Sequence, residues 1–321
     1  MKLDRRQFIV LSSGALAVCP VARAWGAGQE PRWVMPPTQV PVPAQPAPPP
    51  APKFEDVRRN VGIFTMRGGT IGWLINKNGV LVVDTQYPDT ATTCLDGLKQ
   101  KAPGHGIDLV INTHHHADHT GGNAVFRAEA KKLVAQAGVP ALQRQVASAT
   151  ANAPAPVVAD ATFDKTWTAT LGDETVTAMH HGPGHTGADA TVHFERAHVL
   201  HMGDLLFHER HPRVDRAAGA SIQNWIKILE KLGKEMPPDT IFIAGHAKDG
   251  LSPAVDRRAV LRFRDYFDVV LAVTRKAIAQ GQTKDALIAT PALPGFETYQ
   301  GGGVLTLSGV LGVAYDELTA K

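Results

Sequence analysis

Cysteines, long apolar runs and serine-nucleophile motifs are scarce in this chain, and each shortage excludes a class of protein. The 321 residues include two cysteines, Cys19 and Cys94. Loss of an N-terminal signal, argued below, leaves Cys94 alone, which excludes an internal disulfide. The apolar run at residues 8–18 is shorter than the about 20 residues of a membrane-spanning helix, so we expect no stable membrane span after cleavage. No G-x-S-x-G motif is present, so a serine nucleophile of that kind is not indicated.

A strong excess of charge is also missing. The formal net charge of the whole chain is +3. Residues 1–24 hold four basic side chains against one acidic side chain, so this short segment accounts for the excess. The remainder is close to neutral, and no run of Lys and Arg marks a nucleic-acid groove. We therefore expect a small-molecule substrate and no nucleic-acid partner.

The N-terminal segment is typical of an export signal. Asp4-Arg5-Arg6-Gln7-Phe8-Ile9 resembles a twin-arginine signal, and the apolar run after it leads to Ala22-Arg23-Ala24, an A-x-A cleavage site. We expect residues 1–24 to be removed and the protein to reach the periplasm through the twin-arginine export machinery. The alternative is lipid attachment at Cys19, which is disfavoured because Val18 fits that motif poorly.

A proline-rich stretch follows the signal. Residues 31–53 contain ten prolines and few apolar side chains. Such a segment cannot bury enough surface to fold and favours an extended polyproline conformation. We expect residues 25–56 to be a spacer and residues 57–321 to form one folded domain. A ligand for a proline-binding partner is the alternative reading of the stretch.

Four histidines and an aspartate lie within a few residues, in Thr113-His114-His115-His116-Ala117-Asp118-His119. The preceding run, Ile107–Asn112, is typical of a buried strand, so these side chains leave the end of a rigid element. His114 and His116 can project to one side of an extended chain, while His115 points away. Imidazole and carboxylate are ligands that zinc favours, and the cluster therefore predicts a metal site.

Three further candidates each follow a glycine at the end of a predicted strand: Gly184-His185, Gly203-Asp204 and Gly245-His246. The order of these motifs, HxHxDH followed by an isolated His, an Asp and a final His, resembles the metallo-β-lactamase-fold superfamily. The resemblance covers roughly residues 61–250, and the presence of all four motifs in order makes it specific.

The resemblance implies an α/β (α+β) fold, a four-layer αββα sandwich with its site at one edge between two sheets, here with a C-terminal helical extension. The predicted strands are 61–66, 71–76, 80–84, 107–112, 132–135, 166–171, 175–179, 190–194, 197–202 and 240–244. The predicted helices are 89–101, one that begins near Gly121, 139–149, 221–232 and 253–279. The role of residues 283–321, which contain a glycine-rich apolar run, is not predicted.

The resemblance also implies a ligand set. A first zinc site would consist of His114, His116 and His185. A second would consist of Asp118, His119 and His246, and Asp204 would bridge the two ions. Two Zn²⁺ per chain would then provide a bridging hydroxide that attacks a carbonyl, with Asp118 orienting it and passing a proton to the leaving group.

Three more side chains are candidates for supporting roles. Asp84, at the end of a predicted strand, resembles a family carboxylate that steadies the ligand loop; a simple turn cap is the alternative. His208 and His211 belong to a polar loop that either lines the mouth of the substrate cavity or is solvated.

The substrate stays open between an ester, a thioester and a lactam. Asp204 within Gly-Asp-Leu-Leu-Phe resembles the glyoxalase-II-like thioesterases, whereas export favours hydrolysis of β-lactams. We expect a periplasmic dinuclear zinc hydrolase, with a true β-lactamase as the main alternative. A mononuclear iron sulfur dioxygenase that uses His114, His185 and Asp204 is a further alternative. The native metal and the oligomeric state are not predicted.

Overall fold

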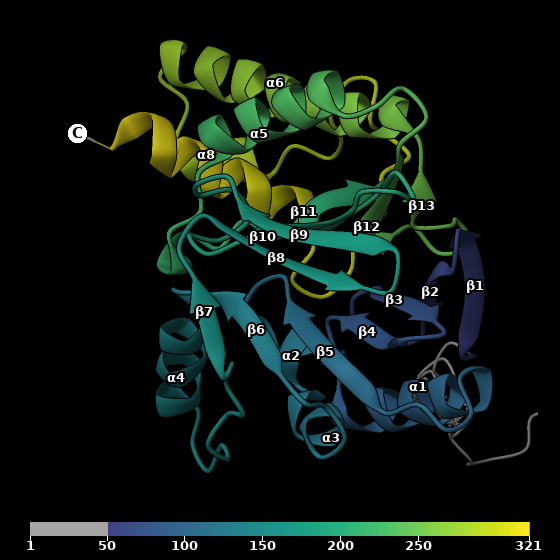
Figure 1. Cartoon of the computed structure of the whole chain (residues 1–321). Coiled ribbons are helices and arrows are strands. Elements are labelled where there is room, and N and C mark those ends of the chain that lie inside the picture. Colours follow the sequence, from purple (N-terminus) through teal and green to yellow (C-terminus); the bar gives the residue numbers. More distant parts are fainter. Residues whose placement is uncertain (1–50, 321) are drawn as a thin grey trace, which may run out of the picture. The chain divides into compact units, whose positions relative to one another are not determined.

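Two mixed β-sheets pack face to face in residues 51–320, the part of the chain that the computed structural model describes (Figure 1). The first sheet has the order β1-β2-β3-β4-β5-β6-β7. Its strands are β1 (Lys53–Arg58), β2 (Val61–Thr65), β3 (Ile71–Asn76), β4 (Gly79–Val83), β5 (Ile107–Asn112), β6 (Leu133–Gln136) and β7 (Ala161–Phe163). The predicted export signal, Cys19 and most of the expected spacer lie outside the described residues.

The second sheet has the order β13-β12-β11-β10-β9-β8. Its strands are β8 (Thr166–Leu171), β9 (Glu174–His180), β10 (Ala190–Phe194), β11 (Val199–His208), β12 (Ile241–Ala247) and β13 (Ala254–Val255). The parallel pairs β4·β5 and β11·β12 bring the carboxyl ends of their strands to one edge, where polar loops can meet.

Helices cover both outer faces of this double sheet (Figure 1). On the first sheet lie α1 (Pro88–Lys101), α2 (Ala117–Thr120), α3 (Asn123–Arg127) and α4 (Val139–Ala149). On the second lie α5 (Ile222–Glu235), α6 (Arg257–Ala279) and α8 (Leu307–Thr319), with the short α7 (Lys284–Ile288) against α8. The predicted αββα sandwich with C-terminal helices is confirmed.

Alternation along the strands builds separate apolar layers. Within β4, Val83 packs in the layer between the two sheets, together with Val192 and Ile243 of the second sheet. The neighbouring residue Val82 packs on the opposite face, under the helices of the first sheet. Successive side chains of a strand point to opposite faces, so a strand covered on both sides must be apolar throughout, as β4 is. The aromatic layer around Trp225 joins the second sheet to α5 and α6.

Two predicted boundaries are wrong. Residues 53–56 were assigned to the spacer, yet they belong to β1, which pairs with β2 and packs Phe54 against Phe64 with ring centroids 4.8 Å apart. Hydrogen bonding to the edge of β2 orders this segment, although its composition alone does not predict a strand. The strand expected to end at residue 202 continues to His208, because a bulge at Gly203 (φ +50°) lets the ladder with β12 go on. Asp204 therefore lies inside β11.

The segment without a predicted role also folds. Within α8, Leu307, Val310, Leu311 and Ala314 recur at helical spacing and are buried, and the helix packs on α6. The glycines before it obscure this pattern in the sequence. None of the helices in residues 51–320 combines the length and the apolar character that crossing a membrane requires.

Candidate metal centre

The histidine motif leaves β5 and turns at once into the one-turn helix α2, and Asp84 anchors this turn. Asp84 Oδ1 accepts a hydrogen bond from the Thr113 N–H, and Oδ2 accepts one from Thr113 Oγ1, both at 2.7 Å. Oδ2 also lies 2.8 Å from His119 Nδ1. Asp84 has φ +64°, a left-handed conformation that Asp tolerates better than most residues. Asp84 thus holds both the strand end and one candidate ligand, which a simple turn cap would not do.

Three buried imidazoles converge in a first cluster. His116 Nδ1 lies 3.1 Å from His114 Nε2 and 2.9 Å from His185 Nε2. His185 belongs to the loop between β9 and β10. Together with Asp204, each of the three histidines offers one ligand atom, and these atoms lie within 4.8 Å of one another.

The outward nitrogen of each ring in the first cluster already has a partner. The three contacts are His114 Nδ1 to Thr113 Oγ1 (3.1 Å), His116 Nε2 to Asp215 Oδ2 (2.8 Å) and His185 Nδ1 to Arg213 O (2.8 Å). A neutral imidazole carries one N–H, and these acceptors take it on the outer side. The inner nitrogens then present three lone pairs to one another, an arrangement that a cation between them stabilises. The donor set therefore fits a metal ion.

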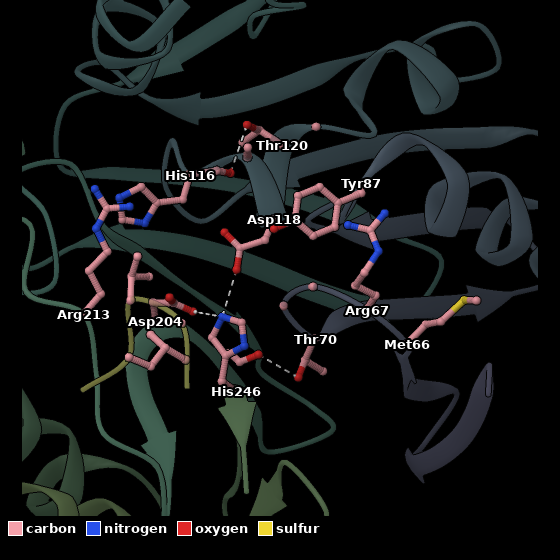
Figure 2. A pocket seen from close by; sticks show the side chains of 18 of the residues that line it. Met66, Arg67, Thr70, Tyr87, His116, Asp118, Thr120, Asp204, Arg213 and His246 are labelled. Carbon is pink, nitrogen blue, oxygen red and sulfur yellow. Dashed lines mark hydrogen bonds and ion pairs between the residues drawn. The ribbon is translucent and has the colours of Figure 1, made fainter. Parts of the chain in front are cut away.

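Asp118 and His119 of α2 form a second cluster with His246 of β12. His246 Nε2 lies 3.1 Å from Asp118 Oδ2 (Figure 2). It lies 3.5 Å from His119 Nε2. Because Asp84 accepts the Nδ1–H of His119, a cation bound at Nε2 would take the place of the proton that this inward nitrogen otherwise carries. The close packing of the His119 ring leaves no room for a side chain at Gly69, where a Cβ would overlap the ring.

Asp204 lies between the two clusters. Its Oδ1 is 3.0 Å from His119 Nε2 and 3.5 Å from His246 Nε2. Its Oδ2 is 3.3 Å from His185 Nε2 and 3.9 Å from His114 Nε2. Oδ1 is buried and makes no hydrogen bond of good geometry within residues 51–320, although His119 Nε2 lies close to it. A buried carboxylate oxygen that is poorly satisfied is costly, and a cation on each side would satisfy Asp204.

The two clusters differ in charge when no cation is bound. Burial lowers the pKa of His114 well below its usual range and that of His185 to about 3, so both imidazoles are neutral. Burial also lowers the pKa of His119 and His246, but the negative charges of Asp204 and then Asp118 raise it by more. They raise the pKa of His119 well above its usual range and that of His246 to about 9. Protons there offset the carboxylates, and a divalent cation would replace them.

A cavity of about 1260 Å³ opens onto both clusters. Figure 2 shows Asp118 and Asp204 pointing at His246 from two sides. The guanidinium groups of Arg213 and Arg67 lie on opposite sides of this centre and line the same cavity (Figure 2). The centre is polar and largely buried, and its exposed access is flanked by positive charge.

Comparison with known proteins agrees with this geometry. Residues 65–246, more than half of the chain, match the family model described as "Metallo-beta-lactamase superfamily". The chain belongs to the metallo-beta-lactamase superfamily. Members of this superfamily are generally hydrolases, and the two His/Asp clusters are groups that could hold divalent metal. The family predicted from the four motifs is confirmed.

Individual relatives are distant. The chain is 22% identical over 205 residues to "Metallo-beta-lactamase type 2" of Elizabethkingia meningoseptica, which covers 61% of this chain and 79% of that protein. A metallo-beta-lactamase from Pontibacter korlensis superposes with a TM-score of 0.56 at 19% identity, over 68% of this chain and 99% of that one. A double mutant of the sec-alkyl sulfatase PisA1 superposes with a TM-score of 0.64 at 17% identity, over 84% of this chain and 50% of that one. At these identities the structural likeness establishes the fold.

The superfamily site brings together all seven side chains that the sequence predicts as ligands. They are His114, His116, Asp118, His119, His185, Asp204 and His246. The two histidines predicted near the cavity mouth lie elsewhere. His208 Nδ1 lies 2.8 Å from Ser252 O and His211 Nδ1 2.8 Å from Tyr266 OH, and neither lines the cavity. The interpretation of these two residues as part of the cavity mouth is therefore wrong. At the end of β11 and just beyond it, the two rings face Ser252 and Tyr266 and do not face the cavity.

Sequence reasoning missed four residues around this candidate metal centre. They are Arg67, Tyr87, Arg213 and Asp215. Arg67 lies over the Tyr87 ring, with the guanidinium carbon 4.1 Å from its centroid. Arg213 Nη2 lies 2.8 Å from Asp215 Oδ2. No local motif marks these residues, since each reaches the site from a segment far away in sequence.

Proposed function

We propose that this protein is a dinuclear zinc hydrolase in which hydroxide attacks the carbonyl carbon of an ester, a thioester or a lactam and the acyl bond to oxygen, sulfur or nitrogen breaks. The observation that supports it most is the place of Asp204, whose two oxygens face different clusters of imidazoles. A single-ion site would need only the first cluster. A second group of Asp and His on the other side of the same carboxylate favours a pair of ions.

Zinc at these clusters would supply Lewis acidity and a nucleophilic hydroxide at neutral pH. The remaining tasks fall to the chain. Asp118 is about a quarter exposed and lines the cavity, so its carboxylate can accept a hydrogen bond from the attacking water. The same carboxylate can then hand the proton to the leaving group as the carbon–heteroatom bond breaks. Asp84, Asp215 and the Arg213 carbonyl fix the imidazoles in the tautomers that face the centre.

Positive side chains support a substrate that is anionic or develops negative charge. Arg213 donates one N–H to Asp215, and its side chain is 43% exposed. Arg67 donates one N–H to Asp89, and its side chain is 47% exposed. A guanidinium carries five N–H donors, so both retain donors for the substrate. At a partly desolvated site such donors stabilise a developing oxyanion.

A periplasmic β-lactamase is the second candidate. It is favoured by two of the three relatives named above, which are metallo-beta-lactamases, and by the twin-arginine signal that the sequence predicts for export. The mononuclear iron dioxygenase alternative would leave Asp118, His119 and His246 without a role, so we rank it below both hydrolases.

A hydrolysis panel on the purified, zinc-loaded protein tests the proposal. It would pair nitrocefin and a carbapenem with acyl-glutathione thioesters and aryl esters, each assayed before and after metal removal with a chelator. We expect hydrolysis that is lost with the metal and restored by zinc. Asp118→Asn should lower the rate and weaken the second-site zinc while the far-UV spectrum, and therefore the fold, stays unchanged. Absence of metal-dependent hydrolysis across the panel would contradict the proposed function.

A further inference from the structure

The exposed apolar side chains of the chain are gathered in one place. Among residues 51–320, the large apolar side chains that are exposed are Val146 (51%), Leu251 (40%) and Val304 (68%). All three line the cavity that contains Asp118 and His246. Folded domains usually scatter such side chains singly, whereas a group of them around a cavity marks a binding surface.

These three side chains come from separate segments. Val146 lies on α4, Leu251 follows β12, and Val304 belongs to the glycine-rich segment before α8. Alanines and prolines of residues 153–156 line the same cavity and extend its apolar surface. We call Val146, Leu251 and Val304 the apolar rim.

Gln300 holds the glycine-rich segment against the strand that carries Asp204. The Gln300 N–H donates to Glu209 O, and Gln300 O accepts from the His211 N–H, both at 3.0 Å. Glu209 and His211 directly follow β11. The backbone of Gln300 therefore continues the ligand-bearing sheet for one more bridge.

The side chain of Gln300 fixes the segment to the other ligand strand as well. Its Oε1 accepts from the Asp249 N–H at 2.7 Å, and its Nε2 donates to Asp249 Oδ2 at 2.6 Å. Asp249 lies just beyond β12, which carries His246. Gly302 and Leu305 then exchange two backbone hydrogen bonds, closing a tight turn that holds Val304 at the cavity. The segment from Gln300 to Leu305 is thus held in place by hydrogen bonds and forms one side of the cavity.

The cavity has a polar interior, and its exposed parts carry the apolar rim beside charged side chains such as Arg67 and Arg213. Asp204 is 4% exposed, His246 12% and Asp118 24% at their side chains, against 40% or more for each residue of the rim. A substrate whose carbonyl group reaches the buried centre can extend the rest of its length toward the rim, because the rim and the centre line one cavity. An apolar chain there would cover side chains that otherwise remain in water.

We propose that the substrate carries an apolar chain that lies on the apolar rim while its acyl carbon sits at Asp118 and Asp204. This inference rests on the proposed function and names its substrate class: acyl esters or thioesters with an apolar tail. The rim selects by burial of methylene groups, since each buried methylene adds affinity. The C-terminal segment is then a specificity-determining element.

A chain-length series tests this inference. Zinc-loaded protein would be assayed with p-nitrophenyl esters from acetate to decanoate, and decanoate and acetate binding would be measured by calorimetry. The test variant combines Val146→Ser, Leu251→Ser and Val304→Ser; the matched control combines Val146→Ile, Leu251→Met and Val304→Ile, which keep the rim apolar. These exposed positions tolerate substitution with little effect on folding.

We expect kcat/KM to rise with chain length in the wild type and in the matched control. In the serine variant the decanoyl-to-acetyl ratio should fall by about tenfold, with acetyl ester hydrolysis unchanged, and decanoate binding should weaken by a similar factor. An unchanged ratio and unchanged decanoate binding would overturn the inference and favour a partner protein as the occupant of the rim. Absence of hydrolysis for every ester here and for every substrate of the panel above would contradict the proposed function alone, and decanoate binding would still decide the role of the rim.

Discussion

His116 Nε2 lies 2.8 Å from Asp215 Oδ2, across 99 positions of sequence. This contact takes the single N–H of His116 on its outer side and turns Nδ1 toward His114 and His185. The His116 hydrogen bond is the main reason why the pKa of Asp215 lies well below its usual range, so the carboxylate stays charged. A charged acceptor behind an imidazole raises its basicity as a ligand.

Asp215→Asn should therefore weaken metal binding at the first cluster. The amide keeps the shape but removes the charge, and we expect a loss of affinity of roughly 10- to 100-fold with little change in stability. Competition with a chromophoric chelator measures it. The matched control is Asp239→Asn, because Asp239 pairs with His198 at the same 2.8 Å on the surface. Equal zinc affinities in the two variants would show that Asp215 does not orient His116 for metal binding.

Zinc binding should release protons at neutral pH. With its pKa near 9, His246 holds a proton at pH 7 that must leave before Nε2 can bind a cation. The affinity should therefore rise as the pH increases toward 9, with about one proton or more released per second-site ion at pH 7. Calorimetry in buffers of different ionisation enthalpy counts these protons. Binding without any proton release would contradict the charge pattern assigned to the second cluster.

Asp204→Asn tests the shared carboxylate. The change keeps the size of the side chain but removes a negative charge between two cations, so the second ion should bind more weakly. We expect the hydrolysis rate to fall by roughly 100-fold or more, about 2.7 kcal/mol of transition-state stabilisation. Asp189→Asn is the control, since Asp189 is also buried but bonds Thr186 and belongs to neither cluster. Wild-type rate and zinc content in the Asp204 variant would exclude the bridge.

The ligand set was predictable because its chemistry is local. Four of the seven ligands stand within a single strand-to-helix turn, and the other three follow Gly184, Gly203 and Gly245, which allow close backbone approach. At Gly245 a Cβ would overlap Asp204 Oδ1, so the glycine marks the position of its neighbour. The histidine motif and the three Gly-His or Gly-Asp pairs therefore suffice to predict the ligands. The family that these motifs resemble then predicts the fold.

The parts that sequence did not predict depend on tertiary contacts. Asp215 and Arg213 matter because a loop after β11 folds back on His116 and His185, which no periodicity encodes. Val304 looks like part of a flexible glycine run until Gln300 ties it to two strands. His208 was assigned to the cavity because it follows Asp204 closely, but strand geometry turns its ring toward Ser252.

Export is tested separately, on residues outside the described part of the chain. Replacing Arg5 and Arg6 together by Lys should leave precursor in the cytoplasm if the twin-arginine route carries the protein. Fractionation followed by immunoblotting measures the distribution, with a protein exported in unfolded form as the control. Normal periplasmic delivery of the double variant would contradict this route.

Metal content tests the central claim most directly. Elemental analysis of the purified domain, wild type and two variants, counts the ions that the two clusters hold. We predict about two zinc ions per chain in the wild type and about one in each of His116→Ala and His246→Ala, with folding checked by circular dichroism. One iron per chain in the wild type, or two zinc ions retained in both variants, would contradict a dinuclear zinc centre built on these residues.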